Sequence, residues 1–205
     1  MTVAPAEARA VLRYLYKGID GFDISRAEEK RVRASRSSAT YGEIMPAATF
    51  ELLDALELGE DDVFYDLGCG VGKVVVAAAL TTCARRCVGV ELAKNRLACA
   101  RKVVARGRRE GLIPERRVLF RHDDIAHTRL DDATVMYTCS TAFPTPFTRA
   151  VMRRVAGIGR PVTFVSSQVL DDHPAFTLLR TLRLDMSWKR RTKVYVYRVL
   201  GKHRA

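Results

Sequence analysis

The fold of this protein is decided by one stretch of its sequence, Val63-Phe64-Tyr65-Asp66-Leu67-Gly68-Cys69-Gly70-Val71-Gly72-Lys73. The stretch begins with β-branched and aromatic residues, which favour a buried strand. Alternating glycines follow, and they allow a sharp turn close to a ligand because no Cβ stands in the way. The apolar run from Val74 to Leu80 predicts a helix, whose first amide groups point back at that ligand.

The details of this glycine turn select among the cofactors that such turns bind. A dinucleotide-binding turn needs glycine where this chain has Lys73, and a Walker A loop needs glycine where it has Leu67. The remaining pattern, Asp-x-Gly-x-Gly-x-Gly, is followed by Glu91 at the end of the next apolar run, where a carboxylate can hold both ribose hydroxyls. The combination predicts S-adenosylmethionine (SAM) as the cofactor, and a tight turn without a ligand is the alternative.

Composition limits the class of protein. The chain has 205 residues, of which 48% are hydrophobic, and this is enough for one domain with a core of its own. Its net charge of +12 favours an acidic partner such as nucleic acid, although solubility alone also accounts for a basic surface. The five cysteines lack paired spacing, so we expect a reducing compartment and no metal site. Without a membrane-length apolar run or a signal peptide, we expect an intracellular protein, cytoplasmic, or nuclear if the source is eukaryotic.

The order of apolar segments predicts an α/β fold with two parts. Residues 1–40 are expected to form a small N-terminal helical appendage, and residues 41–205 a SAM-dependent methyltransferase domain. Helices are expected at residues 6–17, 26–36, 47–56, 74–80, 92–106 and 147–155. Strands are expected at residues 63–65, 87–90, 118–121, 135–138, 162–166, 183–188 and 193–199, the last two as an antiparallel pair. The pattern corresponds to a Rossmann-like seven-stranded sheet.

Three loops at strand ends or entries supply further candidate residues. The loop 40–46 feeds into the first strand and can fold over a cofactor with Tyr41 and Glu43, unless it is an ordinary turn. The third strand ends at Asp123 and Asp124, where an acid in a SAM-binding fold meets the adenine amino group. Asp124, before Ile125, is the first choice, and a helix-capping role before Ala126 is the alternative. The loop after the fourth strand lies at the carboxyl edge of the sheet, where open α/β sheets place their sites.

These segments together resemble the disruptor-of-telomeric-silencing (DOT-one type) protein-lysine methyltransferases. Thr40-Tyr41-Gly42-Glu43-Ile44 is similar to their Tyr-Gly-Glu loop. Asp66-Leu67-Gly68-Cys69-Gly70-Val71-Gly72 is similar to their Asp-Leu-Gly-Ser-Gly-Val-Gly turn. Gly89-Val90-Glu91 with Arg96 resembles the next motif, and Ser187-Trp188 resembles their Ser-Trp ending. The resemblance covers about residues 40–200.

The resemblance implies roles for individual residues. Tyr41 and Glu43 would close over the methionine part of SAM, and Glu91 would hold the ribose. The residues expected to contact the cofactor are Tyr41, Glu43, Asp66, Gly68, Cys69, Gly70, Gly72, Lys73, Glu91, Leu92, Asp123, Asp124, Ile125 and Cys139. Those expected to serve catalysis are Tyr41, Glu43, Ser140 and Phe143. No metal is expected.

The loop after the fourth strand and position 73 depart from the family pattern. The family has Asn-Asn-Phe-Ala-Phe where this chain has Cys139-Ser140-Thr141-Ala142-Phe143, and Lys73 replaces an uncharged polar residue. The leading hypothesis is methyl transfer to a lysine of a protein substrate, which includes histones and other basic or nucleic-acid-bound proteins. The alternatives are an RNA or small-molecule methyltransferase and a non-catalytic SAM-binding module that docks on acidic partners. Contact between the basic surface and nucleic acid is a further expectation.

Overall fold

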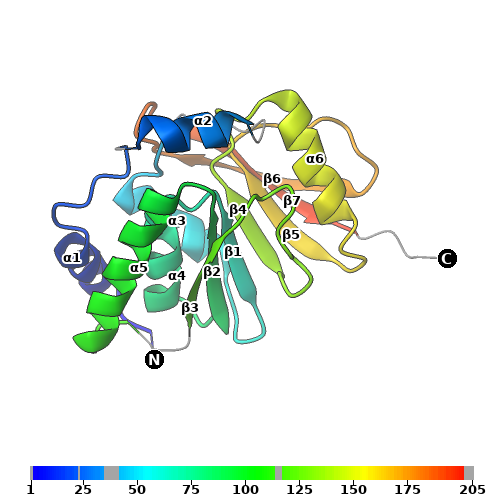
Figure 1. Cartoon of the computed structure of the whole chain (residues 1–205). Coiled ribbons are helices and arrows are strands. Elements are labelled where there is room, and N and C mark those ends of the chain that lie inside the picture. Colours follow the sequence, from blue (N-terminus) through cyan, green and yellow to red (C-terminus); the bar gives the residue numbers. More distant parts are fainter. Residues whose placement is uncertain (1, 23, 35–41, 114–116, 201–205) are drawn as a thin grey trace.

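A computed structural model of the chain describes residues 2–22, 24–34, 42–113 and 117–200 (Figure 1). The helices are α1 (Pro5–Leu15), α2 (Arg26–Ala34), α3 (Pro46–Leu56), α4 (Lys73–Thr81), α5 (Lys94–Arg109) and α6 (Thr145–Ala156). The strands are β1 (Val63–Leu67), β2 (Arg86–Glu91), β3 (Val118–His122), β4 (Val135–Thr138), β5 (Val162–Ser166), β6 (Phe176–Leu184) and β7 (Thr192–Val199). None of the helices in these ranges is both long and apolar enough to cross a membrane.

The strands form one seven-stranded sheet in the order β3-β2-β1-β4-β5-β7-β6. Strands β1 to β5 run parallel, and β7 lies antiparallel between β5 and β6. The predicted Rossmann-like α/β sheet is therefore confirmed. The chain direction across the sheet reverses between β1 and β4, and in open α/β sheets the crevice at such a reversal is where ligands bind.

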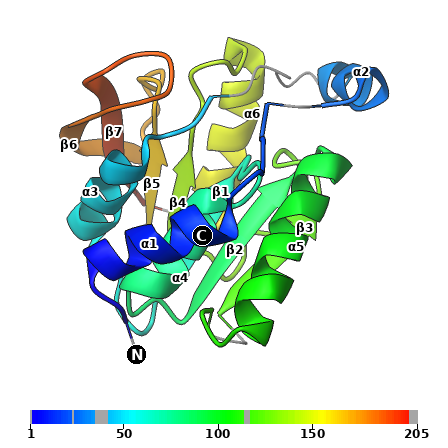
Figure 2. The same cartoon turned by 90° about the vertical axis from the view of Figure 1, so that its left-hand side faces the viewer.

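The two faces of the sheet are covered unequally. Phe64 of β1 packs into a cluster with α1, α3, α4 and α5, whereas Val63, Tyr65 and Leu67 pack on the other face with α6. Figure 2 shows this arrangement, with α1, α3, α4 and α5 on one side of the strands and α6 on the other. Successive side chains of β1 thus point to opposite faces of the sheet and pack into both clusters. Asp66, near the carboxyl end of the strand, lies on the face covered by α1, α3, α4 and α5.

The prediction for the penultimate strand is wrong. The sequence predicts it at residues 183–188, but β6 covers Phe176–Leu184 and Ser187-Trp188 lie in the connection to β7. Residues 176–184 pair with β7, with a register shift between Leu178 and Arg180, and the chain then leaves that ladder. Met186 instead forms an isolated antiparallel bridge with Ile44. The connection between the last two strands is thereby joined to the loop that precedes α3.

Helix α1 packs directly on the sheet domain, although residues 1–40 were expected to form a separate appendage. Its Ala8 and Leu15 are buried in the cluster that covers α4. Directly after the helix, the buried Tyr16 hydroxyl donates a hydrogen bond of 3.1 Å to the carbonyl of Val71 in the glycine turn. The N-terminal helix is thus attached to the loop that the sequence assigns to the cofactor.

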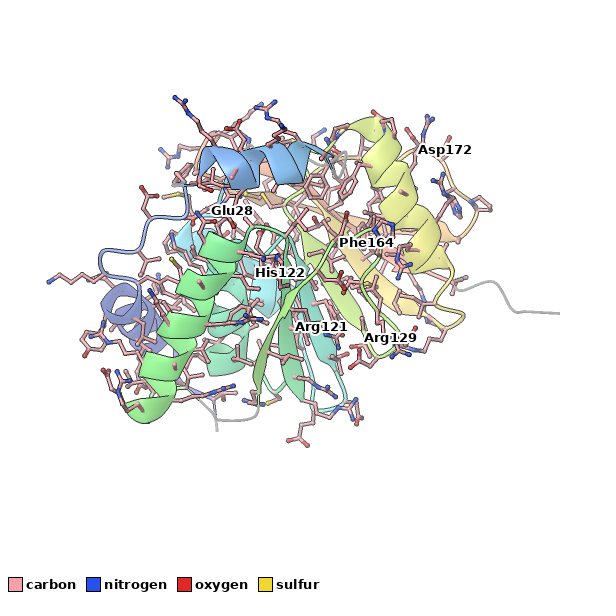
Figure 3. All side chains as sticks on the ribbon, viewed as in Figure 1. Glu28, Arg121, His122, Arg129, Phe164 and Asp172 are labelled. Carbon is pink, nitrogen blue, oxygen red and sulfur yellow. The ribbon has the colours of Figure 1, made fainter. Side chains whose placement is uncertain are left out.

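Helix α2 lies above the carboxyl edge of the sheet and is attached to α5. The Glu28 side chain reaches the top of α5 (Figure 3), where Oε1 accepts a 3.0 Å hydrogen bond from the backbone N–H of Asn95. Arg96 is buried, although its side chain is charged, and it donates a 2.9 Å hydrogen bond to the carbonyl of Gly21. Arg96, which belongs to the motif shared with the family, therefore holds the N-terminal segment against α5.

The Tyr16 hydrogen bond can be measured as a stability difference. Replacing Tyr16 by Phe removes the hydroxyl and leaves the buried Val71 carbonyl without this donor, so we expect the free energy of unfolding to fall by about 1 kcal/mol. Urea denaturation is the measurement. Tyr195→Phe is the matched control, because no hydrogen bond of the described residues uses its hydroxyl. Equal midpoints for both variants would show that the Tyr16 bond does not hold α1 in place.

Candidate functional site

A cavity opens at the carboxyl ends of β1 and β4, where the direction of the sheet reverses. Four segments bring residues to it: the loop before α3, the glycine turn, the first turn of α4 and the end of β4. Its lining residues are Gly42, Glu43, Ile44, Asp66, Gly68, Cys69, Lys73, Val74, Tyr137 and Cys139. Six residues that the sequence assigned to the cofactor therefore meet in one place: Glu43, Asp66, Gly68, Cys69, Lys73 and Cys139.

Asp66 is the most perturbed carboxyl group of this cavity. It is buried with an exposed fraction of 2%. Burial, together with the negative charge of Glu91, raises its pKa from 3.8 to about 8. At neutral pH the Asp66 carboxyl is therefore mostly protonated in the free protein. A cation placed beside Asp66 would favour its ionised form, so this group is suited to hold a positively charged ligand.

Glu43 and Lys73 form an ion pair across the cavity. Their Oε2 and Nζ atoms lie 2.6 Å apart, and the side chains are 18% and 36% exposed. Glu43 is placed by two hydrogen bonds to Ser187: its N–H donates to Ser187 Oγ, and its carbonyl accepts from the Ser187 N–H. The loop before α3 and the β6–β7 connection therefore position Glu43 together.

The free space in the cavity is small. It amounts to about 30 Å³, which is room for about two water molecules at about 10–15 Å³ each. A ligand the size of SAM needs several hundred Å³. The cavity by itself therefore does not hold a whole SAM molecule.

Glu91 supports the glycine turn from the end of β2. Its Oε2 accepts a 2.9 Å hydrogen bond from the Gly70 N–H, and its Oε1 accepts a 2.7 Å bond from the Ala93 N–H. Each carboxylate oxygen has a second lone pair, so both remain able to accept a ribose hydroxyl. Gly70 has a φ of +54°. At Gly72, where φ is +82°, a Cβ would also collide with the ring of Phe120, so this position needs glycine for its conformation and for space.

The loop after β4 presents Cys139 to the cavity and turns Ser140 away from it. Ser140 is 1% exposed, and its Oγ lies 2.8 Å from Ser166 Oγ. Phe143 covers the glycine turn, since a Cβ built on Gly68 would lie 3.8 Å from its ring. Burial raises the pKa of Cys139 to about 12, with a further contribution from Asp66. The Cys139 thiol is therefore neutral and is not poised as a nucleophile.

The residues after β3 lie outside this cavity. Asp124 Oδ1 accepts a 2.8 Å hydrogen bond from the Ala126 N–H, so Asp124 caps a turn, whereas the alternative interpretation expected a helix there. Asp123 Oδ1 accepts from the Asp124 N–H, and Ile125 is buried in the core beside α6. The Leu92 carbonyl is 2.9 Å from His122 Nε2. A direct contact of these residues with a cofactor stays a prediction.

Tyr41 lies outside the described residues, so its expected contact stays a prediction. Tyr137 lines the cavity and was not predicted; its hydroxyl is buried and has no hydrogen-bond partner at suitable geometry within the described ranges. The strand register identifies Tyr137 as a site residue, because Tyr137 of β4 pairs with Asp66 of β1. The hydroxyl lies beside the Cys139 thiol, a weak partner, so it is suited to a polar ligand group.

The residues present fit the chemistry of SAM. With SAM bound, Glu43, Asp66 and Glu91 would offer carboxylates to its positive charges and its ribose hydroxyls, and Lys73 would offer a cation to its carboxylate. The glycines at 68, 70 and 72 leave the turn open for the close approach of a ligand, and the α4 amides point towards it.

Comparisons with known proteins bear on this site. The family model described as "Histone methylation protein DOT1" matches residues 24–176. Over 60 residues the chain is 40% identical to an H3 lysine-79-specific histone-lysine N-methyltransferase of Caenorhabditis elegans. This match covers 29% of the chain and only 6% of the nematode protein. Over 46 residues, 22% of the chain, it is 37% identical to a protein-lysine N-methyltransferase of Saccharolobus islandicus, of which 29% is covered.

Solved structures share the fold. An RNA methyltransferase from Salinibacter ruber, in complex with S-adenosyl-L-homocysteine, superposes with a TM-score of 0.54 and 24% identity. The match covers 78% of this chain and 94% of that one. A putative RNA methyltransferase from Pyrococcus horikoshii gives a TM-score of 0.53 at 14% identity, over 96% and 98% of the two chains. At these identities the likeness concerns the fold.

Proposed function

Because this chain belongs to the histone methylation protein DOT1 family, we propose that it transfers a methyl group from SAM to the ε-amine of a protein lysine. The family model matches most of the described part of the chain, but the curated relatives are matched over less than a third of their own length. The activity and the substrate are therefore proposals, which the site residues support.

The observation that carries the proposal is the meeting of Glu43 with the glycine turn. The Tyr-Gly-Glu loop and the Asp-Leu-Gly-Cys-Gly-Val-Gly turn are far apart in sequence, yet Glu43, Asp66 and Gly68 line one cavity. In the proposed complex Asp66 and Glu43 face the positive charges of the methionine end. Glu91 holds the ribose, and the segment from Asp123 to Ile125 lies on the adenine side.

The chemistry is a direct displacement. When bound, SAM supplies an activated methyl group on a positively charged sulfur. The neutral lysine nitrogen attacks this carbon, the N–C bond forms as the C–S bond breaks, and sulfur keeps the electron pair. The methylated ammonium then loses its proton to solvent. This chain's residues align the two reactants, and such alignment supplies a large part of the rate.

The amine must be neutral to react, although free lysine has a pKa near 10.4. A dry channel beside a positive sulfur lowers that pKa by desolvation and by repulsion between like charges. We assign Phe143 and Trp188, with Tyr41, to the walls of that channel. Ser140 is assigned a positioning role, because its hydroxyl joins the loop after β4 to the end of β5.

Methyl transfer is tested with labelled SAM offered separately to nucleosomes, free histones, cell protein extract and total RNA. We expect label on the ε-amines of protein lysines, identified after acid hydrolysis. Glu43→Ala should reduce this incorporation by at least about tenfold, because the methyl donor loses an aligning contact. Glu51→Ala is the matched control, since Glu51 is exposed on α3 and lies outside the cavity.

The remaining outcomes point to specific alternatives. Label confined to RNA or to small molecules would replace the protein substrate by that class. Binding of SAM in a separate titration, with no label on any acceptor, would favour a non-catalytic SAM-binding module. An unchanged rate for Glu43→Ala would return the loop before α3 to the role of a plain turn.

Cofactor affinity should depend on pH through Asp66. In the free protein its carboxyl is protonated below about pH 8. A bound ammonium group lowers the pKa of Asp66, so binding releases a proton. Cofactor affinity therefore rises with pH, by at most about tenfold per pH unit. The rise ends where the pH passes the Asp66 pKa of the free protein. Titration calorimetry with S-adenosylhomocysteine at several pH values below 8 measures the slope. In Asp66→Asn this contribution should vanish, and an unchanged slope would remove Asp66 from contact with the charged group.

A further inference from the structure

A second hollow lies on the far side of the Glu43–Lys73 pair from the cofactor cavity. It runs between α1 and the start of α3, which Figure 2 shows next to each other, and has a volume of about 540 Å³. Its lining residues are Arg9, Leu12, Arg13, Tyr16, Lys17, Glu43, Ile44, Met45, Pro46, Thr49 and Lys73. We call this hollow the α1–α3 groove. It shares Glu43, Ile44 and Lys73 with the cofactor cavity, so the ion pair forms the wall between the two.

The charge of the α1–α3 groove is strongly one-sided. Four basic side chains line it, and its one carboxylate, Glu43, is already paired with Lys73. Arg9, Arg13 and Lys17 are exposed and follow one another along α1 and its end at about helical spacing. No carboxylate of the described residues lies within ion-pair distance of these three. Cations gathered in this way around a concave surface attract an anion.

The floor of the groove is apolar. Leu12, Ile44, Met45 and Pro46 contribute to it, and Met45 remains 42% exposed although it is a large hydrophobic residue. Arg9 also lies over the ring of Phe50, with its Cζ 5.5 Å from the ring centroid. An apolar floor with a cationic rim suits a ligand that has an apolar body and an anionic head. The volume falls within the range of small-molecule sites, about 300–1,000 Å³.

We propose that the α1–α3 groove binds a small amphipathic anion, with its apolar body on Leu12, Ile44 and Met45 and its anionic group held by Arg13 and Lys17. Lys73 closes the inner end, so this ligand and the cofactor would occupy adjoining and separate sites. The proposal concerns a site outside the cofactor cavity and does not depend on which substrate is methylated.

The test uses 1-anilinonaphthalene-8-sulfonate, an apolar anion whose fluorescence rises on binding, with the full-length protein. We expect saturable binding to one site. Arg13→Glu and Lys17→Glu should each weaken it by at least about tenfold, because a repulsive charge replaces an attractive one at short range. Lys102→Glu is the matched control: it makes the same charge change on the exposed face of α5 and should leave the affinity as it is. Equal weakening in all three variants would show that only net charge matters and would overturn the proposal.

Two further arms test what the probe recognises and where it binds. N-phenyl-1-naphthylamine has the same rings without the sulfonate and should bind at least about tenfold more weakly, and equal binding would remove the anionic requirement. S-adenosylhomocysteine should not compete with the probe, whereas an apparent Kd that rises in proportion to its concentration would place the probe in the cofactor cavity. Displacement by poly-L-glutamate, which has charge without an apolar body, would assign the groove to an acidic protein segment instead.

Discussion

Cofactor binding is expected to be lost in Gly70→Arg. Gly70 has a φ of +54°, and its N–H donates to Glu91 Oε2 inside the buried turn. A side chain at this position has to project from the turn where the cofactor is expected to approach the backbone most closely, and its Cβ is strained at positive φ. We expect the affinity for S-adenosylhomocysteine to fall by at least about 100-fold, which corresponds to about 3 kcal/mol. Titration calorimetry measures this directly.

The strain of the substitution has its own control. Gly159 also has a positive φ, of +80°, but a Cβ there meets open space. Gly159→Arg should therefore reproduce the backbone strain, about 1–2 kcal/mol of stability, and leave cofactor affinity at its normal level. If Gly70→Arg bound the cofactor as tightly as Gly159→Arg, the assignment of the glycine turn to SAM would be wrong.

Methyl transfer is expected to fall in Gly42→Ala, although the substitution adds one methyl group. A Cβ at Gly42 would collide with the ring of Trp188, so either the ring or the loop that carries Glu43 has to move. Trp188 is 42% exposed and can yield without disrupting the core. We expect turnover to fall by at least about tenfold, because small displacements of aligning groups have large effects on rate. The free energy of unfolding should change little by comparison.

The displacement can be observed independently of activity. Trp188 is the one tryptophan in the sequence, so intrinsic fluorescence reports its position. Gly42→Ala should shift that emission, while the control Gly59→Ala, whose Cβ would have only an ordinary contact, should not. The double variant Gly42→Ala/Trp188→Ala removes the ring and tests whether the collision displaces Glu43. Without the collision Glu43 should return to its place, so cofactor binding should be tighter than in Gly42→Ala. An unchanged emission and rate in Gly42→Ala would contradict the close packing of the two residues.

The sequence by itself determined the sheet and the centre of the site. β-branched and aromatic runs specify buried strands, and glycines at alternate positions specify a turn that other residues do not adopt. Both are local effects, so the strands from β1 to β5 and the glycine turn could be predicted. Residues at the carboxyl ends of parallel strands come together at one edge of a sheet, and for this reason the residues after β1 and β4 could be expected at one site.

The tertiary structure decided which neighbouring side chain faces the cavity. Cys139 and Ser140 are adjacent in sequence, but Ser140 turns to Ser166 because a hydroxyl partner is present at the end of β5. Likewise Asp124 caps the turn at Ala126, and the charged side chain of Arg96 is buried because it reaches the carbonyl of Gly21. The orientations of Ser140 and Arg96 depend on partners far away along the chain, so composition and periodicity do not predict them.

The last two strands show the same limit. The sequence predicts a strand at residues 183–188, whereas the strand that pairs with β7 lies at 176–184. Residues 185–187 are left to hold the loop of Glu43 through Ser187. The Glu43–Lys73 pair, which separates the cofactor cavity from the α1–α3 groove, exists only because that loop is held there. Local propensity therefore determined the sheet and its glycine turn, while long-range hydrogen bonds and charge pairing decided the walls of the site.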